Sequence, residues 1–556
     1  MTINAATILE TDVLVIGSGG AGLRAAIEAR KHGADVLLVS YSRAGYGSNT
    51  TISGGAFAAV PSYGTPGFQA GDSVEQHFKD TVEGGLYLTN QTLSETMARG
   101  AGQQIEDLRS FGVRYASADG FPWIALSVDP GHSKFRMVYG QNSFGTDFTF
   151  PLRQYAITQG VRFLEGTLIT GLVKSADTVV GAVGIDTEGQ ALILAAPAVV
   201  LASGGLGQLY SRTDNAGGST GDGYALAYNA GATIQDMEFV QFYPLSLGLG
   251  TPTPTYECLL LETGGRLLNN RGEDIVAKHS LDNPMSLTRD RLSQAMAKEV
   301  LSGLCSDDMV TLDLHEIPKA KLEILQPLLP KAFLKGEMRF PVAPTVHFHM
   351  GGVRINERCE TGVTGLYAAG EVCAGVHGAN RLSGNALTEA WVFGTIAGRE
   401  AAMRAGDVKR DSLSAEQVAA ELRRVNRLTS GKADEKVESL TRSLREAMWN
   451  RAGIIRNAEG LKQALETVAD LQERFCNASA TSQRELRLMV RLGNMLTVAE
   501  MVCRAALFRT ESRGAHYRQD YPEQNNSDWL CNVLLSKKGE QPVLDTEPVS
   551  LAKLTP

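Results

Sequence analysis

The fold of this chain follows from residues 11–39, TDVLVIGSGGAGLRAAIEARKHGADVLLV. Residues 11–16 are apolar and β-forming, residues 21–32 have helical periodicity, and residues 35–39 form a second β-type run. A Gly-x-Gly-x-x-Gly loop, with Gly17, Gly19 and Gly22, separates the first run from the helix. The pattern predicts a βαβ unit.

A glycine loop in this place aims free backbone N–H groups and the helix dipole at a pyrophosphate. A tight strand-to-helix turn without a ligand is the plainer alternative. The acidic residue that usually contacts the adenosine ribose is missing, because Ser40 and Tyr41 follow the second run, and Ser40 is the expected substitute. The expected dinucleotide contacts here are Gly17, Ser18, Gly19, Gly20, Ala21, Gly22, Ser40 and Tyr41.

Composition limits the function classes. The 556 residues allow two to four domains, and a net charge of −8 argues against nucleic acid as a partner. Seven scattered cysteines without a Cys-x-x-Cys pair predict no iron-sulfur cluster in the chain, and no other metal site is expected. The amino terminus shows no secretory pattern, and the longest apolar run, residues 191–202, is too short for a membrane span. We expect a cytoplasmic protein that contacts membranes only through partners.

Residues 344–387 carry the clearest chemistry. His347 precedes a glycine pair, and Arg381 follows Asn380. A histidine and an arginine are cationic donors suited to a carboxylate, so this segment predicts a site for a small anionic substrate. A satisfied core histidine and a structural ion pair are the alternatives, and His349 is at least as well explained by packing.

The same segment resembles the flavoprotein subunit of the fumarate reductase and succinate dehydrogenase family, whose His-x-x-Met-Gly-Gly and Gly-Ala-Asn-Arg-Leu motifs match residues 347–352 and 378–382. The resemblance runs nearly end to end. Further motifs in the same order are residues 17–22, 48–55, 202–205, 220–223, 288–290, 511–516 and 528–531.

The resemblance implies an α/β fold: a Rossmann-like FAD-binding domain (1–236 and 344–410), an inserted α+β capping domain (237–343), a C-terminal helical domain (411–515) and a tail (516–556). Buried strands at residues 198–202 and 365–369 would return the chain to the nucleotide fold. The implied further FAD contacts are Ser48, Asn49, Thr50, Ser53, Gly54, Gly55, Asp222, Glu371, Arg381, Ala386 and Leu387.

In the family, a hydride passes between the flavin N5 and one alkene carbon of a dicarboxylate, while an arginine handles the proton at the neighbouring carbon. Arg289 matches this arginine, and His347 and Arg381 match the residues that hold one carboxylate. A surface arginine paired with Asp290 is the alternative for Arg289.

The other half of the substrate site departs from the family. Tyr243 and Leu245 replace a histidine and a threonine, Glu257 is the best match for the acidic proton relay, and a leucine replaces the relay arginine. A second carboxylate would therefore lose polar partners. We expect fumarate or a related α,β-unsaturated acid with one free carboxylate.

The flavin attachment also differs. Asn49 stands where many membrane-bound relatives have the histidine that is covalently joined to the flavin, so FAD should be noncovalent. Within the family, loss of the covalent link to the flavin is associated with a bias toward alkene reduction.

The tail resembles that of succinate dehydrogenase flavoproteins, which favours an iron-sulfur partner subunit. L-aspartate oxidase, which shares noncovalent FAD and the 131–133 stretch, is the enzymatic alternative. The second alternative is a non-catalytic subunit that transfers electrons through its flavin.

Overall fold

The computed structural model describes most of the chain. The described residues are 7–62, 71–117, 131–247, 253–254, 257–281, 288–326, 329, 331–408, 413–430, 435–539 and 541–556. None of the helices within these ranges is long and apolar enough to cross a membrane.

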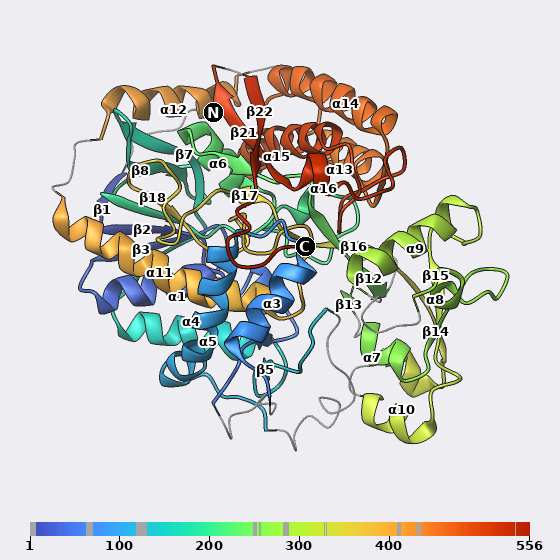
Figure 1. The fold of residues 1–556 in the computed structure, drawn as a ribbon. Coiled ribbons are helices and arrows are strands. Elements are labelled where there is room, and N and C mark those ends of the chain that lie inside the picture. The colour runs from blue at the N-terminus through green and yellow to red at the C-terminus, as the bar shows by residue number, and fades with distance from the viewer. Residues whose placement is uncertain are drawn as a thin grey trace.

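The centre of the main body is a parallel five-stranded sheet (Figure 1). Its strands, in spatial order, are β18 (Leu366–Ala368), β10 (Ala198–Leu201), β2 (Val13–Ile16), β3 (Val36–Ser40) and β6 (Arg162–Glu165). β2, β3 and β10 are buried along their whole length, as expected for strands covered on both faces. The predicted βαβ unit and both predicted return strands are confirmed.

Helices α1 (Gly20–Lys31) and α11 (Asn385–Asp407) pack against each other beside this sheet. Their approach is close because α11 presents Gly398, where an added Cβ would lie 2.3 Å from the carbonyl oxygen of Ala25. The remaining elements around the sheet are α2 (Asn49–Ile52), β4 (Ala56–Ala58), α3 (Val74–Gly84), α4 (Gln91–Ser110), β5 (Met137–Tyr139), α5 (Thr146–Thr158), η3 (Gly207–Leu209) and α6 (Asp222–Ala230).

A second sheet covers another side of the main body. Its order is β1 (Thr7–Glu10), β9 (Ala191–Ala195), β8 (Thr178–Ile185) and β7 (Leu168–Ser175). Helix α12 (Ala415–Arg427) packs on β7 and β8. The first helix after residue 411 thus contacts the nucleotide-binding part of the molecule.

The inserted segment forms a separate lobe at the right of Figure 1, with its own hydrophobic cluster. Its sheet has the order β13 (Thr253–Pro254), β12 (Val240–Leu247), β16 (Arg339–His349), β15 (Val310–Asp313) and β14 (Arg266–Leu268). The lobe also contains α7 (Glu257–Glu262), α8 (Ile275–Lys278), α9 (Arg289–Leu301), α10 (Lys319–Leu325) and η5 (Lys331–Lys335). β12 and β16 pair antiparallel and connect the lobe to the main body.

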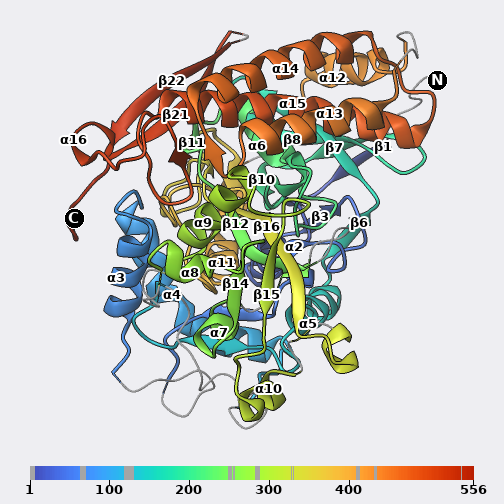
Figure 2. The same ribbon diagram turned by 90° about the vertical axis from the view of Figure 1, so that its right-hand side faces the viewer.

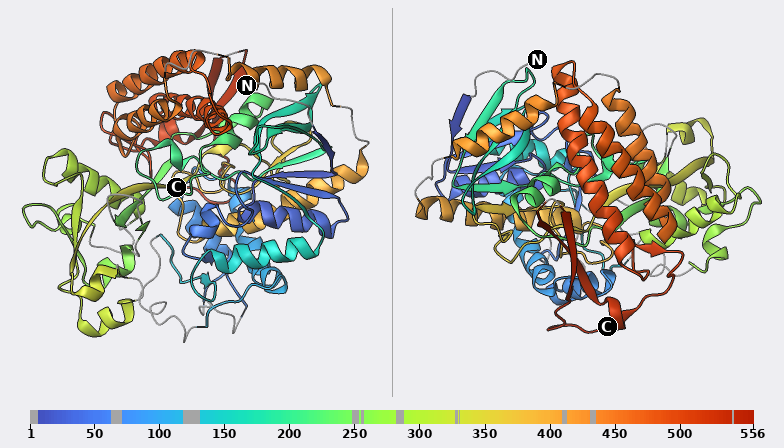
Figure 3. Two further views of the ribbon diagram at one scale, coloured as in Figure 1. Left: turned by 180° about the vertical axis from the view of Figure 1, so that it is seen from behind. Right: turned by 90° about the horizontal axis from the view of Figure 1, so that it is seen from above.

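Three long helices, α13 (Val437–Arg451), α14 (Ala458–Asn477) and α15 (Gln483–Phe508), lie side by side, as the view from above in Figure 3 shows. The chain then forms β20 (Tyr517–Arg518), which pairs with β19 (Ile455–Arg456), and α16 (Asn526–Trp529). The final hairpin, β21 (Cys531–Lys538) and β22 (Gln541–Pro548), joins a sheet with β11 (Ile234–Gln235) and β17 (Gly352–Val353). The tail therefore pairs with the strands that flank the inserted lobe.

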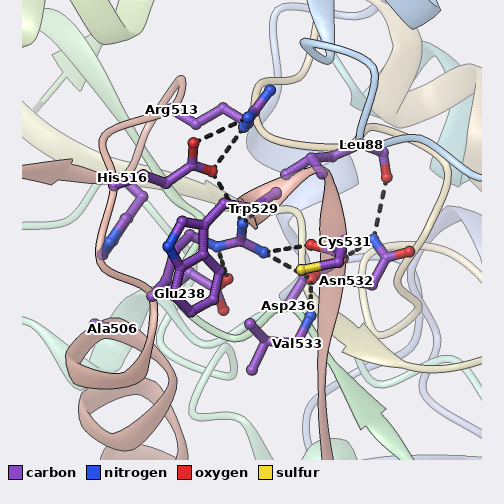
Figure 4. A network of polar contacts seen from close by, with 12 residues as sticks. Leu88, Asp236, Glu238, Ala506, Arg513, His516, Trp529, Cys531, Asn532 and Val533 are labelled. Carbon is purple, nitrogen blue, oxygen red and sulfur yellow. Dashed lines mark hydrogen bonds and ion pairs between the residues drawn. The ribbon is translucent and has the colours of Figure 1, made fainter. Parts of the chain in front are cut away.

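A buried charge network fixes the tail to the entrance of the lobe (Figure 4). Arg509 is fully buried and donates to Glu238 Oε1 at 2.6 Å, Glu511 Oε1 at 3.0 Å and the carbonyl of Cys531 at 2.8 Å. Arg513 donates to both oxygens of Glu511. Since Glu238 lies just ahead of β12, the network ties the lobe to the C-terminal segment.

Candidate active site

The glycine loop after β2 is shaped for a close-lying ligand. Gly17 has φ +112°, and an added Cβ would lie 2.1 Å from the carbonyl oxygen of Ala202. The hydroxyls of Ser18 and Ser40 are 2.6 Å apart, so Ser40 lies beside the loop, and its contact with a ribose stays a prediction. The cap residue of α1 is Gly19, and the first turn contains Gly20, Ala21 and Gly22 without an acidic side chain.

Tyr41 lies at the outer end of this region and is 37% exposed. The guanidinium carbons of Arg487 and Arg491, both from α15, lie 4.7 Å and 4.6 Å from the centre of its ring. Sequence reasoning did not identify these two arginines, because α15 is distant in sequence.

Asn49 makes hydrogen bonds through both ends of its amide. Its Nδ2 donates to Asn215 Oδ1 at 3.0 Å and to Glu371 Oε2 at 3.1 Å. Its Oδ1 accepts from the backbone N–H of Ala216 at 2.9 Å and from the Ser219 hydroxyl at 3.1 Å. The amide thus joins the loop that begins at Ser48 to residues 215–219 and to the segment after β18.

The other predicted cofactor residues surround the same region. Thr50 Oγ1 accepts from the N–H of Gly20 at 3.0 Å, and Ser48 caps α2. Ser53 donates to the carbonyl of Thr50, and Gly54 and Gly55 follow it. Asp222 begins α6 and accepts from Asn494 and Thr220, whereas Ala386 and Leu387 lie in the first turn of α11.

The carboxyl group of Glu371 is buried beside Asn49. Burial raises its pKa to about 7, although the Asn49 amide and the His349 N–H favour the charged form. The His349 ring packs edge-on against Tyr224 and donates to the carbonyl of Met237 at 3.1 Å. Burial lowers the pKa of His349 to about 4, which fits the packing interpretation of this residue.

His347 occupies a β-bulge. In the β12–β16 ladder Val346 opposes Phe242 and Phe348 opposes Gln241, so His347 is the extra residue. Bulges of this kind redirect a side chain. The imidazole Nδ1 donates to Asp214 Oδ2 at 2.8 Å.

The loop containing Asp214 holds this bulge through the backbone as well. Asn215 Nδ2 donates to the carbonyl of His347 at 2.7 Å, and the Thr213 hydroxyl donates to that of Val346 at 3.0 Å. Because Asn215 also bonds Asn49, the cofactor loop and the bulge share one residue. Asp214 and Asn215 were missed at the sequence level, where an unremarkable Thr-Asp-Asn was the only signal.

Arg381 is held by Gln241 and is 4% exposed. Its Nη2 donates to Gln241 Oε1 at 2.9 Å, and Gln241 Nε2 donates to Asn380 Oδ1 and to the carbonyl of Arg381, both at 2.8 Å. Asn380 Nδ2 in turn donates to Asp290 Oδ1 at 3.0 Å. The start of α9 in the inserted lobe is therefore bonded to the Asn380-Arg381 pair. Gln241 was also missed as a site residue.

The ring of Tyr243 lies close to both Arg289 and His347. The guanidinium carbon of Arg289 lies 4.8 Å from the centre of its ring, and the centre of the His347 ring lies 5.0 Å from the same point. Burial first, and then the charge of Arg289, lower the pKa of Arg381. Four of the five predicted catalytic residues, Arg289, Tyr243, His347 and Arg381, thus meet where the lobe joins the main body.

His347 is subject to opposing effects. Burial lowers its pKa, Asp214 raises it, and the charges of Arg289 and Arg381 lower it further. The imidazole is 27% exposed, so its remaining edge can reach a ligand.

Glu257 and Leu245 are two positions at which we expected the chain to differ from, or to match only loosely, the family's substrate site. Glu257 begins α7, but its side chain lies outside the described residues, so its relay role stays a prediction. Leu245, which we expected to remove a hydroxyl from the substrate side, is fully buried in the hydrophobic cluster of the lobe. A second register shift, between Tyr243 and Ser246, accompanies this change of direction. This burial favours a packing role for Leu245, and the loss of a hydroxyl from the substrate side stays a prediction.

Known proteins match this architecture over nearly its whole length. Residues 12–387 match the family described as FAD binding domain, and residues 441–556 match fumarate reductase flavoprotein C-term. The fumarate reductase flavoprotein subunit of Mycobacterium tuberculosis is 34% identical over 95% of this chain and 95% of its own. The chain belongs to the fumarate reductase and succinate dehydrogenase flavoprotein family.

Two further relatives show the range of this family. A variant of FrdA from the E. coli quinol fumarate reductase superposes with a TM-score of 0.90 at 30% identity, covering 99% of this chain and 98% of that one. An L-aspartate oxidase of Nostoc is 30% identical over 95% of this chain and 93% of its own. The family assignment makes the chain a flavin-dependent oxidoreductase with FAD as its cofactor.

The residues present fit FAD. The cap residues of α1 and α11, Gly19 and Gly384, make no side-chain capping bond. The N–H of Gly20 donates to Thr50 Oγ1 and that of Asn385 to the carbonyl of Leu382, so the first-turn N–H groups that follow them are the ones suited to ligand oxygens. Within the described part of the chain, the buried Ser203 hydroxyl after β10 also has no hydrogen-bond partner. The glycine loop and α1 would hold the diphosphate, and α11 and Glu371 would hold the flavin end.

Proposed function

We propose that this chain is the catalytic subunit of a complex that reduces the alkene of fumarate or a related α,β-unsaturated carboxylate, with electrons supplied by an iron-sulfur subunit. The observation that carries the proposal is the position of Tyr243 between Arg289 and His347, at 4.8 Å and 5.0 Å. This arrangement supports a role for the lobe's Arg289 beside His347 and Arg381, which would bind a carboxylate. A scaffold for electron transfer alone has no need of such an arrangement.

In this proposal His347 and Arg381 bind one substrate carboxylate. Arg381 is pre-oriented by Gln241, and His347 by Asp214 and the bulge, so little side-chain freedom is lost on binding. The two cations also withdraw electron density from the alkene as charge develops on the carboxylate. Bound FAD would supply both electrons of the reduction as a hydride to one alkene carbon.

Arg289 is the proposed proton donor to the other alkene carbon. Its position depends on α9, whose Asp290 is bonded to Asn380 beside Arg381. The position of α9 in the lobe is therefore linked to the carboxylate site through one hydrogen bond. Glu257 is the proposed source of the replacement proton.

Noncovalent FAD and an iron-sulfur partner are part of the proposal. Asn49 uses its amide in four hydrogen bonds and has no group that forms a flavin bond. The partner is inferred from the relative named as the flavoprotein subunit of a fumarate reductase.

Steady-state kinetics test the proposal against both alternatives. The purified protein is assayed with reduced viologen and fumarate, crotonate or cinnamate, and separately with L-aspartate and oxygen. Alkene reduction supports the proposal. Peroxide formation from L-aspartate would identify an oxidase, and no turnover in either assay with full flavin occupancy would leave a non-catalytic electron-transfer protein.

A further inference from the structure

A tight turn lies within the Glu-Ser-Arg-Gly-Ala-His motif at residues 511–516. The N–H of Arg513 donates to the carbonyl of His516 at 2.8 Å, and the N–H of His516 donates to that of Arg513 at 3.0 Å. Gly514 has φ +53°, in the left-handed region that favours glycine. The Arg513 guanidinium is held by both oxygens of Glu511. The 513–516 turn therefore has a fixed shape.

One side of this turn rests on the main body next to the proposed carboxylate site. The N–H of Ala515 donates to the carbonyl of Ala379 at 3.0 Å. A Cβ added at Gly514 would lie 2.4 Å from the same carbonyl oxygen, so the two backbones approach too closely for any side chain at this position. Ala379 directly precedes Asn380 and Arg381. The turn thus contacts the segment that carries Arg381.

The other side of the turn contacts α9 in the inserted lobe. Gln294 is half-buried, and its Nε2 donates to the carbonyl of Gly514 at 2.9 Å. Lys298, one turn further along the helix, has its ammonium nitrogen 4.6 Å from the centre of the Tyr517 ring. Figure 2 shows α9 beside β12, with the C-terminal elements above it. Side chains four residues apart lie on one face of a helix, so this face of α9 is held against the C-terminal segment.

Arg289 is the first residue of the same helix. It precedes Gln294 by five residues, which is about 7.5 Å along the helix axis. The bond between Asp290 and Asn380 fixes the helix near its start, but one contact leaves the helix free to pivot about it. The contact at Gln294 restricts that rotation. The direction in which Arg289 points therefore depends on both contacts.

We propose that Gln294 is a positioning residue for the proton donor, because its bond to Gly514 orients α9 so that Arg289 meets a substrate held by His347 and Arg381. This inference rests on the proposed function, since it assumes that Arg289 gives a proton to the alkene. It adds a role for Gln294 and for the 511–516 motif in the reaction.

The variant Q294M removes the N–H donor and keeps a side chain of similar length. It is assayed with reduced viologen and the unsaturated acid that the unaltered protein reduces best. We expect kcat to fall by about tenfold to a hundredfold, since a misplacement of about 1 Å can cost about 10²-fold in rate. KM should stay unchanged, because the bonds that orient His347 and Arg381 remain. The ratio of kcat in H2O to kcat in D2O should rise, because proton transfer then limits the rate.

Two controls separate positioning from a general loss of structure. Q463M removes a comparable amide bond, from Gln463 Nε2 to Glu459 on the exposed face of α14, and should keep normal kcat. Q294R again offers N–H donors to the Gly514 carbonyl and should recover most of the lost kcat. If Q294M loses flavin or melts early, Q294E gives the same kinetic test, since it keeps the shape of the side chain and replaces the donor by an acceptor.

The inference is overturned if the Gln294 variants keep normal kcat, if they change KM instead of kcat, or if Q294R is no better than Q294M. An unaltered protein that reduces no alkene would refute the proposed function, and this inference would fall with it. An active unaltered protein with an equally active Q294M would refute this inference alone.

Discussion

The Asp214 carboxylate accepts a hydrogen bond from His347 Nδ1 at 2.8 Å, and His347 is the extra residue of the β16 bulge. Two features from distant parts of the sequence thus set the direction and the charge of one imidazole. Asp214 opposes the effect of burial, since it raises the pKa of His347 while burial lowers it. Carboxylate binding favours the protonated ring.

D214N should therefore weaken substrate binding. Loss of the carboxylate lowers the pKa of His347, so the rise of KM with increasing pH should begin at a lower pH than in the unaltered protein. At neutral pH we expect KM to rise by roughly tenfold to a hundredfold, the equivalent of one charged hydrogen bond. The measurement is KM against pH, with D177N in the exposed β7–β8 turn as control. An unchanged pH profile would remove Asp214 from the proposed site.

R289Q should abolish most alkene reduction without loss of FAD. A proton donor of this kind contributes about 10²-fold to 10⁴-fold to the rate, so kcat should fall within or beyond that range. Arg291, two positions along α9 and exposed, provides the matched control R291Q, which should keep normal kcat. An R289Q protein with most of its activity would assign the proton to another group.

Y243H should restore a family residue at the substrate side. A recovered hydrogen bond to a charged group is worth about 1.5 to 3 kcal/mol, so KM for fumarate should fall relative to crotonate. L245T is the informative companion, because Leu245 is in the core of the lobe. It should lower the melting temperature and leave the fumarate KM unchanged. If the unaltered protein already binds fumarate at micromolar KM and Y243H is worse, Tyr243 is itself a competent carboxylate ligand.

FAD should leave the protein on denaturation. Asn49 cannot form the covalent bond, so acid precipitation should release all of the yellow colour into the supernatant. The denatured polypeptide is then examined on a gel for flavin fluorescence. Fluorescence that stays with the polypeptide would contradict noncovalent binding.

R509M should destabilise the whole protein, because it leaves Glu238 buried without its ion-pair partner, whereas Glu511 keeps Arg513. Breaking a buried ion pair in this way costs about 3 to 5 kcal/mol. R504M is the control, since Arg504 forms a partly exposed pair with Glu500 on α15 that should contribute less than about 1 kcal/mol. Thermal unfolding of both variants makes the comparison. Equal melting temperatures would show that the network is not important for stability.

Local patterns in the sequence were sufficient for the central sheet. The βαβ unit and the strands at residues 198–202 and 365–369 follow from apolar periodicity and glycine placement, which depend only on neighbouring residues. The family motifs added the positions of Arg289, His347 and Arg381, because each motif is itself a short local pattern.

Tertiary structure decided what joins these pieces. Three hydrogen bonds of the site connect residues that are 90 to 140 positions apart in the sequence. They join Asp214 to His347, Gln241 to Arg381 and Asn380 to Asp290. The burial of Leu245 in the lobe accompanies a register shift in the β12–β16 ladder. The pairing of the tail with β11 likewise depends on the order of strands in the sheet. Periodicity within one segment carries no information about such contacts, since they form only when the lobe and the C-terminal segment pack against the main body.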